Sequence, residues 1–135
     1  MQRKKIKIGV IISSNTIANN IKTMKLDPQY DIRLSVVGLE MAIDEGLSME
    51  KSGIEVILSH TGTSNFLQEN IQVPVISIHH SSLDLISAMK EASRLGREIL
   101  IPNFRERKQN LKIINELFPV DVKEGIYHDS QSLEE

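Results

Sequence analysis

Short runs of β-branched residues alternate along this chain with stretches whose apolar residues recur at helical spacing. The first run, residues 6–12 (IKIGVII), is almost continuously apolar, which is typical of a strand covered on both faces. The stretch after it places Ile17, Ile21 and Met24 three or four residues apart, which predicts an amphipathic helix. A strand followed by a helix is therefore the first predicted unit.

The same alternation continues along the rest of the chain. We expect strands at residues 32–37, 54–58, 73–78, 98–101 and 120–127, helices at 16–25, 39–52, 63–70, 82–95 and 104–118, and the first turn of another helix at 130–135. Strands separated by helices imply βαβ crossovers and parallel pairing. The predicted fold class is α/β, with three α/β/α layers and a mainly parallel sheet. We expect a first lobe at residues 1–98 and the start of a second, similar lobe at 99–135 that is truncated.

Composition narrows the classes of function. Hydrophobic residues make up 40% of the chain and charged residues 25%, a balance that predicts a packed globular core. A net charge of −2, with its only basic cluster at residues 3–7, predicts no direct binding of nucleic acid. The chain has no cysteine, which excludes disulfides, thiolate nucleophiles and cysteine zinc sites. Because we find neither a secretory signal nor a run of roughly 20 apolar residues, we expect a cytoplasmic protein with no membrane segment.

Polar segments follow most of the predicted strands, and ligands of open α/β sheets bind beyond the carboxyl ends of strands. By that rule the candidate ligand-binding residues are Ser13, Ser14 and Asn15 after the first strand, Ser59, His60, Thr61, Gly62, Thr63 and Ser64 after the third, residues 79–82 after the fourth, and Asn103 and Arg105 after the fifth. Hydroxyls and helix N-terminal amides gathered at one edge would attract phosphate or carboxylate groups. Ser, Thr and Asn are also the preferred helix N-caps, so each segment taken singly has an ordinary structural explanation.

Binding is better supported by the sequence than catalysis. The histidines His60, His79, His80 and His128 have no carboxylate at a familiar ligand spacing, so we expect no metal site and no cofactor. The phosphate-loop, dinucleotide and nucleophile-elbow motifs are missing. Two alternatives stay open. One is a small racemase or lyase that uses strand-end Ser and His as acid and base, and the other is a module that dimerises through an apolar edge of the second lobe.

The centre of the sequence carries a motif that resembles a known family. It is spelled by Ser59, Gly62, Thr63 and Ser64, then by Val73, Pro74, Val75, Ile76 and Ile78, and then by Ser81, Asp84 and Ile86. This order is similar to the N-terminal sensory domain of the propionate-catabolism activator PrpR and its relatives. The resemblance covers roughly residues 5–130.

The resemblance implies a non-catalytic, two-lobed α/β receptor that stands ahead of an ATPase module and a helix-turn-helix in sigma-54-dependent transcriptional activators. It implies ligand contact at Ser59, Gly62, Thr63 and Ser64, with Ser81 and Asp84 close by. The expected partner is a small anionic metabolite, either a di- or tricarboxylate or a phosphate compound. DNA and sigma-54 RNA polymerase would be reached only through domains outside this chain, and homo-oligomerisation stays open. The family often has Arg-Gly where this chain has His60-Thr61, so we expect that a positive partner for a carboxylate is either lost there or becomes pH-dependent.

Overall fold

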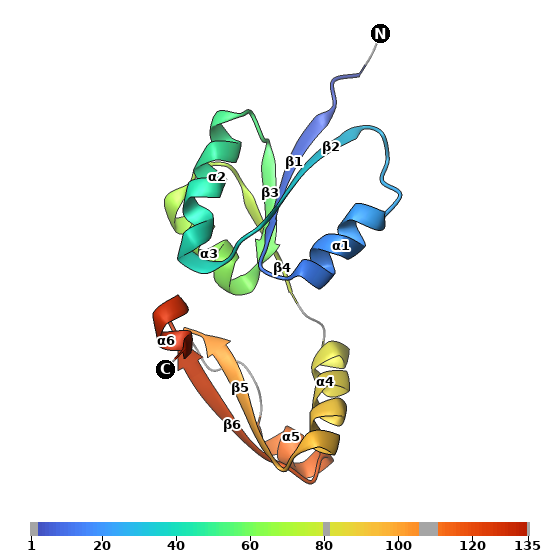
Figure 1. Ribbon diagram of the computed structural model, residues 1–135, viewed down its shortest axis with the longest axis vertical. Helices are drawn as coiled ribbons and strands as arrows, with labels where there is room; N and C mark the ends of the chain where they lie inside the picture. The colour runs from blue at the N-terminus through green and yellow to red at the C-terminus, as the bar shows by residue number, and fades with distance from the viewer. Residues whose placement is uncertain (1–2, 80–81, 106–110, 135) are drawn as a thin grey trace. The chain divides into compact units, whose positions relative to one another are not determined.

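The structure, a computed structural model, describes residues 3–79, 82–105 and 111–134. The chain divides into two compact units, Met1–His79 and His80–Glu135, and each is described here by itself (Figure 1). The elements of the first unit are β1 (Ile6–Ile12), α1 (Asn15–Thr23), β2 (Tyr30–Val36), η1 (Leu39–Met41), α2 (Ala42–Lys51), β3 (Val56–His60), α3 (Thr61–Asn70) and β4 (Val75–Ile78). Its four strands form a parallel sheet in the order β2-β1-β3-β4.

Helices cover both faces of this four-stranded sheet (Figure 1). Ile12 of β1 packs with Ala18 of α1, while the adjacent Ile11 packs with Met49 of α2 and Leu67 of α3. Successive side chains of a strand point to opposite faces, so one short apolar strand supplies two cores. All five side chains are almost fully buried. The predicted α/β class, the parallel pairing and the layered arrangement are confirmed.

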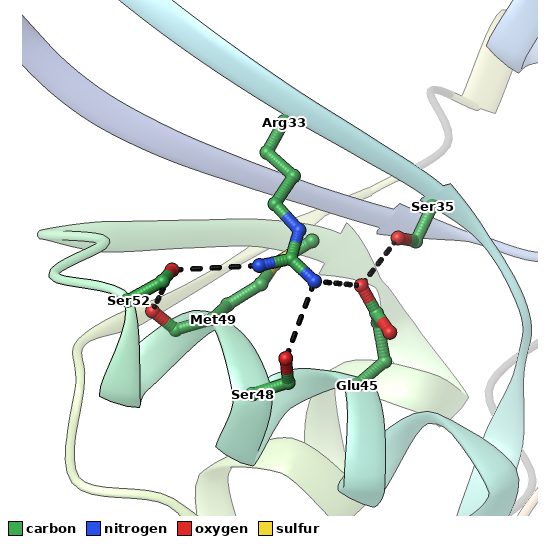
Figure 2. Close-up of polar contacts among 6 residues, drawn as sticks. All are labelled: Arg33, Ser35, Glu45, Ser48, Met49 and Ser52. Atoms are coloured by element: carbon green, nitrogen blue, oxygen red, sulfur yellow. Dashed lines mark hydrogen bonds and ion pairs between the residues drawn. The ribbon is translucent and has the colours of Figure 1, made fainter.

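Polar contacts hold α2 against the edge strand β2 (Figure 2). Arg33 Nη2 lies 3.0 Å from Glu45 Oε1 and 3.3 Å from the Ser48 hydroxyl oxygen. The Ser35 hydroxyl donates to the same Glu45 oxygen at 2.7 Å. Because Arg33 and Glu45 are both partly exposed, we assign their ion pair at most about 1 kcal/mol. The ion pair mainly fixes the position of α2, because it joins this helix to β2, the strand that precedes it.

The second unit is a smaller α/β arrangement of α4 (Ser82–Leu95), β5 (Glu98–Phe104), α5 (Leu111–Leu117), β6 (Asp121–Tyr127) and α6 (Ser130–Glu134). β5 and β6 form a separate two-stranded parallel sheet. Met89 of α4, Ile114 of α5 and Val122 of β6 form its core. This unit starts at His80, whereas we placed the start of the second lobe at residue 99, so α4 belongs with β5 and β6.

The third strand lies two residues later than we predicted. We expected residues 54–58, and the strand runs over Val56–His60. Ser59 pairs with Ile11 of β1 and with Ser77 of β4, so backbone pairing on both sides extends the strand through polar residues. Ser59 and His60 therefore belong to a strand rather than to a turn.

The helix that we predicted from residue 104 is shorter. Phe104 is the last residue of β5, where it pairs with Tyr127 and the two ring centroids are 5.4 Å apart. This cross-strand aromatic contact prolongs the strand. The helix α5 covers Leu111–Leu117, and residues 106–110 lie outside the described part of the chain.

Candidate functional site

Two of the predicted polar segments lie at one edge of the first sheet. β1 and β3 are neighbours and run parallel, so their carboxyl ends reach the same edge. The register pairs Ile11 with Ser59, which puts residues 13–15 beside the start of α3. The Ser59 hydroxyl donates to the Ile11 carbonyl at 2.6 Å. The two segments are thus joined by a buried hydrogen bond just before both strands end.

A third segment, the turn that follows β2, joins this edge. The Leu39 N–H donates to Thr63 Oγ1 at 2.8 Å. Gly38 lies against Ser13, because a Cβ added to Gly38 would stand 2.8 Å from the Ser13 Cβ. Leu39 has a φ of 55°, which is uncommon for a residue other than glycine and marks local strain. We did not predict this turn, although the strand-end rule applied to β2 would have selected Gly38.

Both α1 and α3 begin at this edge. His60 ends β3 and is the N-cap of α3, with no loop between strand and helix. Ser14 is the N-cap of α1, and its hydroxyl oxygen accepts from the Ile17 N–H at 3.3 Å. The first-turn amides of a helix have no intrahelical acceptor and carry partial positive charge. Two helix N-termini therefore give one sheet edge a preference for anions.

Three of the predicted side chains are used inside the protein. Ser59, Thr63 and Ser64 are 0%, 3% and 0% exposed. The Ser64 hydroxyl donates to the Thr61 carbonyl at 2.9 Å and lies 2.9 Å from the Ser77 hydroxyl, which links α3 to β4. These hydroxyls hold the edge together. The predicted residues that keep exposed or half-buried surface in this unit are Ser13, Ser14, Asn15, His60, Thr61 and Gly62.

The other predicted site residues belong to the second unit. Asp84 is exposed in the first turn of α4. Arg105 follows β5, where its N–H donates to the Tyr127 carbonyl at 2.8 Å and its guanidinium lies 4.7 Å from the centroid of the Phe104 ring. Ser81 lies outside the described residues. A role for Asp84, Arg105 and Ser81 in ligand binding stays a prediction.

The chemistry of the described residues is that of hydrogen bonding. In the described ranges, no three His, Asp or Glu side chains are grouped so that they could hold a metal ion. None of the helices described is both long and apolar enough to cross a membrane. Burial raises the pKa of Tyr127, and hydrogen bonds from Ser132 lower the pKa of Asp129. Both of these groups belong to the second unit and lie outside the edge formed by β1 and β3.

Comparison with known proteins identifies a family and a similar fold. The family model PrpR_N, described as propionate catabolism activator, matches residues 26–135. The fold is similar to that of an NtrC family transcriptional regulator from Clostridium acetobutylicum, known from a crystal structure. The TM-score is 0.84 at 20% sequence identity, over 94% of this chain and 67% of that chain. No curated protein shows a significant match.

Proposed function

The chain belongs to the PrpR_N family of propionate catabolism activators, and we propose that it is the effector-sensing domain of a sigma-54-dependent transcriptional activator. In this proposal the domain is non-catalytic and cytoplasmic. It binds a small anionic metabolite, such as a di- or tricarboxylate or a phosphate compound, at the carboxyl edge of β1 and β3. The observation that carries the proposal is the convergence of the turns after β1 and β2 with two helix N-termini at that edge.

The ligand would meet backbone amides more than hydroxyl groups. The hydroxyls of Ser59, Thr63 and Ser64 are already bonded within the protein. The amides of Thr61 and Gly62 lie in the first turn of α3, where helical geometry provides no acceptor. Such amides bind phosphate and carboxylate oxygens well because they are fixed in direction before the ligand arrives.

Binding would regulate by stabilising one conformational population of the domain over another. The output would come from modules outside this chain, which would contact DNA and sigma-54 RNA polymerase. A catalytic alternative needs an activated nucleophile or acid–base pair. The Ser59 hydroxyl instead donates to a backbone carbonyl, which favours binding over turnover at this edge.

The test is a thermal-shift screen of the protein against di- and tricarboxylates and phosphorylated metabolites. A ligand at 100 times its dissociation constant should stabilise the fold by about 2.7 kcal/mol. Asn15→Asp places a carboxylate at the first position of α1, where the helix dipole tolerates it, but where it would repel an anion. We expect it to weaken binding by roughly tenfold, or about 1.4 kcal/mol.

Asn19→Asp is the matched control, because Asn19 is exposed one turn further along the same helix. It should leave the ligand-induced shift close to that of the unmodified protein. The proposal is wrong if no anion raises the melting temperature, or if the two aspartate variants weaken binding equally.

A further inference from the structure

Two polar side chains of the second unit, Asn103 and Glu124, carry buried atoms that have no hydrogen-bond partner among the described residues. Asn103 is 6% exposed, and its Nδ2 atom meets no acceptor. Both carboxylate oxygens of Glu124 are inaccessible to water and meet no donor. The ion pairs found among the described residues, Arg33–Glu45 and Arg94–Glu91, do not involve Glu124. Buried polar atoms in proteins are nearly always hydrogen bonded, so an unpaired set indicates a function, an ion or a bound molecule.

The strand register brings these two side chains to the same face. It pairs Ile101 with Glu124 and Asn103 with Ile126. Because residues two apart on a strand share a face, Asn103 and Glu124 are diagonal neighbours on adjacent strands. The same face carries Val122, which packs with α4 and α5. The two polar groups therefore stand beside an apolar core, with Asn103 near the carboxyl end of β5, where ligands of parallel sheets bind, and Glu124 at the middle of β6.

The unpaired atoms of Asn103 and Glu124 define which chemical groups could bind to them. Glu124 offers two acceptor oxygens and, when ionised, a negative charge that is unfavourable in a buried place without a cation. Asn103 offers a donor. A water molecule can satisfy both hydrogen-bonding needs, but it cannot neutralise the charge. A group with a protonated nitrogen beside an oxygen acceptor satisfies all three requirements.

We propose that Asn103 and Glu124 form a binding site for a compound that carries an ammonium group beside a carboxylate, as α-amino acids do. The ammonium donates to the two Glu124 oxygens in charge-assisted hydrogen bonds. The ligand carboxylate accepts from Asn103 Nδ2. The site lies within the second unit and does not rest on the anion site proposed for β1 and β3.

The experiment measures binding of a panel of L-α-amino acids to the 135-residue protein by thermal shift and calorimetry. We expect at least one amino acid to raise the melting temperature. Glu124→Gln keeps the shape of the side chain and removes the charge, and Asn103→Leu removes the donor. Each should weaken binding by about 10- to 100-fold, the range expected for a hydrogen bond to a charged group.

Glu116→Gln is the matched control, because Glu116 is an exposed glutamate of α5 in the same unit; binding should be unchanged. Two analogues of the best-binding amino acid should bind more weakly than it does. One is the amine that lacks the carboxylate, and the other is the carboxylic acid that lacks the ammonium group. Circular dichroism of Glu124→Gln checks that this variant is folded. The test with Glu124→Gln therefore stands even if Asn103→Leu does not fold.

Several results would overturn the inference. One is a wild-type protein that no amino acid stabilises, and another is full binding by Glu124→Gln. Stabilisation by Ca²⁺ or Mg²⁺ alone that Glu124→Gln abolishes would assign the carboxylate to a cation site instead. The anion screen reports separately on the first unit, since its diagnostic variant is Asn15→Asp.

Discussion

Thr63 joins α3 to the turn after β2 through one hydrogen bond, in which the Leu39 N–H donates to its hydroxyl oxygen. Leu39 is in the left-handed region at φ 55°, a conformation that costs roughly 1–2 kcal/mol for a residue with a side chain. Thr63 is 3% exposed, so water cannot readily replace its oxygen. The Thr63 hydroxyl therefore stabilises a strained turn at the candidate site. This structural role explains the burial of Thr63 better than ligand contact does.

The contact between Gly38 and Ser13 can be tested by a pair of substitutions. Gly38→Ala would put a Cβ 2.8 Å from the Ser13 Cβ, which is too close without a backbone shift. Gly38 has a φ of −140°, which any residue adopts, so the effect is purely steric. We expect a loss of about 1–3 kcal/mol in the free energy of unfolding, measured by urea denaturation.

Ser13→Gly removes the opposing Cβ and should restore most of that stability in the double variant. The coupling energy of the double-mutant cycle is the readout, since residues in contact do not behave additively. Additive effects of the two substitutions would show that the turns after β1 and β2 are not in contact.

The direct passage of β3 into α3 shapes the candidate site more than any single side chain. Backbone pairing on both sides of β3 continues to Ser59, and the helix starts at Thr61. Because no loop intervenes, the first amides of α3 are held at the sheet edge by the strand itself. A site formed by backbone atoms on regular elements is more rigid than one formed on a loop.

The short helix α6 begins at a pH-sensitive cap. The Ser132 N–H donates to Asp129 Oδ1 at 2.8 Å, and the Ser132 hydroxyl oxygen lies 2.9 Å from the same atom. These bonds lower the pKa of Asp129 from its ordinary value of 3.8. A folded-state pKa below the unfolded value means that the ionised group stabilises the helix above pH 3.8. That stabilisation is lost as pH falls through the folded-state pKa.

We therefore expect α6 to fray in acid before the strands unfold. Backbone NMR chemical shifts of residues 130–134 should move towards random-coil values as the pH falls through the folded-state pKa of Asp129. Asp129→Ala should give the same local change at neutral pH. Asp121→Ala is the control, and it should leave α6 unaffected. Helical shifts that persist in Asp129→Ala would contradict the capping role.

The two units differ in how much core each contains. The first has two buried clusters, one on each face of a four-stranded sheet. In the described residues of the second, one cluster is centred on Met89, Ile114 and Val122, against a sheet of two strands. Small domains bury a lower fraction of their surface, and a two-stranded sheet is marginal without further packing. The stability of the molecule is therefore concentrated in the first unit.

A cut between the units tests this difference. A fragment of residues 1–79 should show a cooperative thermal transition by circular dichroism. A fragment of residues 80–135 should show a weak or broad one. Mixing the two fragments is the control for mutual stabilisation. A first fragment that does not fold alone would show that its sheet depends on the second unit.

The order and type of most elements followed from the sequence, because apolar periodicity is local and each run must bury its own side chains. The strand-end rule selected residues around the carboxyl ends of β1 and β3, which lie at one sheet edge, and their role in ligand binding stays a prediction. Tertiary structure decided which edges meet, since the order β2-β1-β3-β4 comes from pairing between distant segments. It also decided that Ser59 and Ser64 are buried, because their hydrogen-bond partners, the Ile11 carbonyl and the Ser77 hydroxyl, lie 48 and 13 residues away in the chain. The unpaired Asn103 and Glu124 became visible for the same reason, because burial and missing partners are properties of packing in space and no local pattern encodes them.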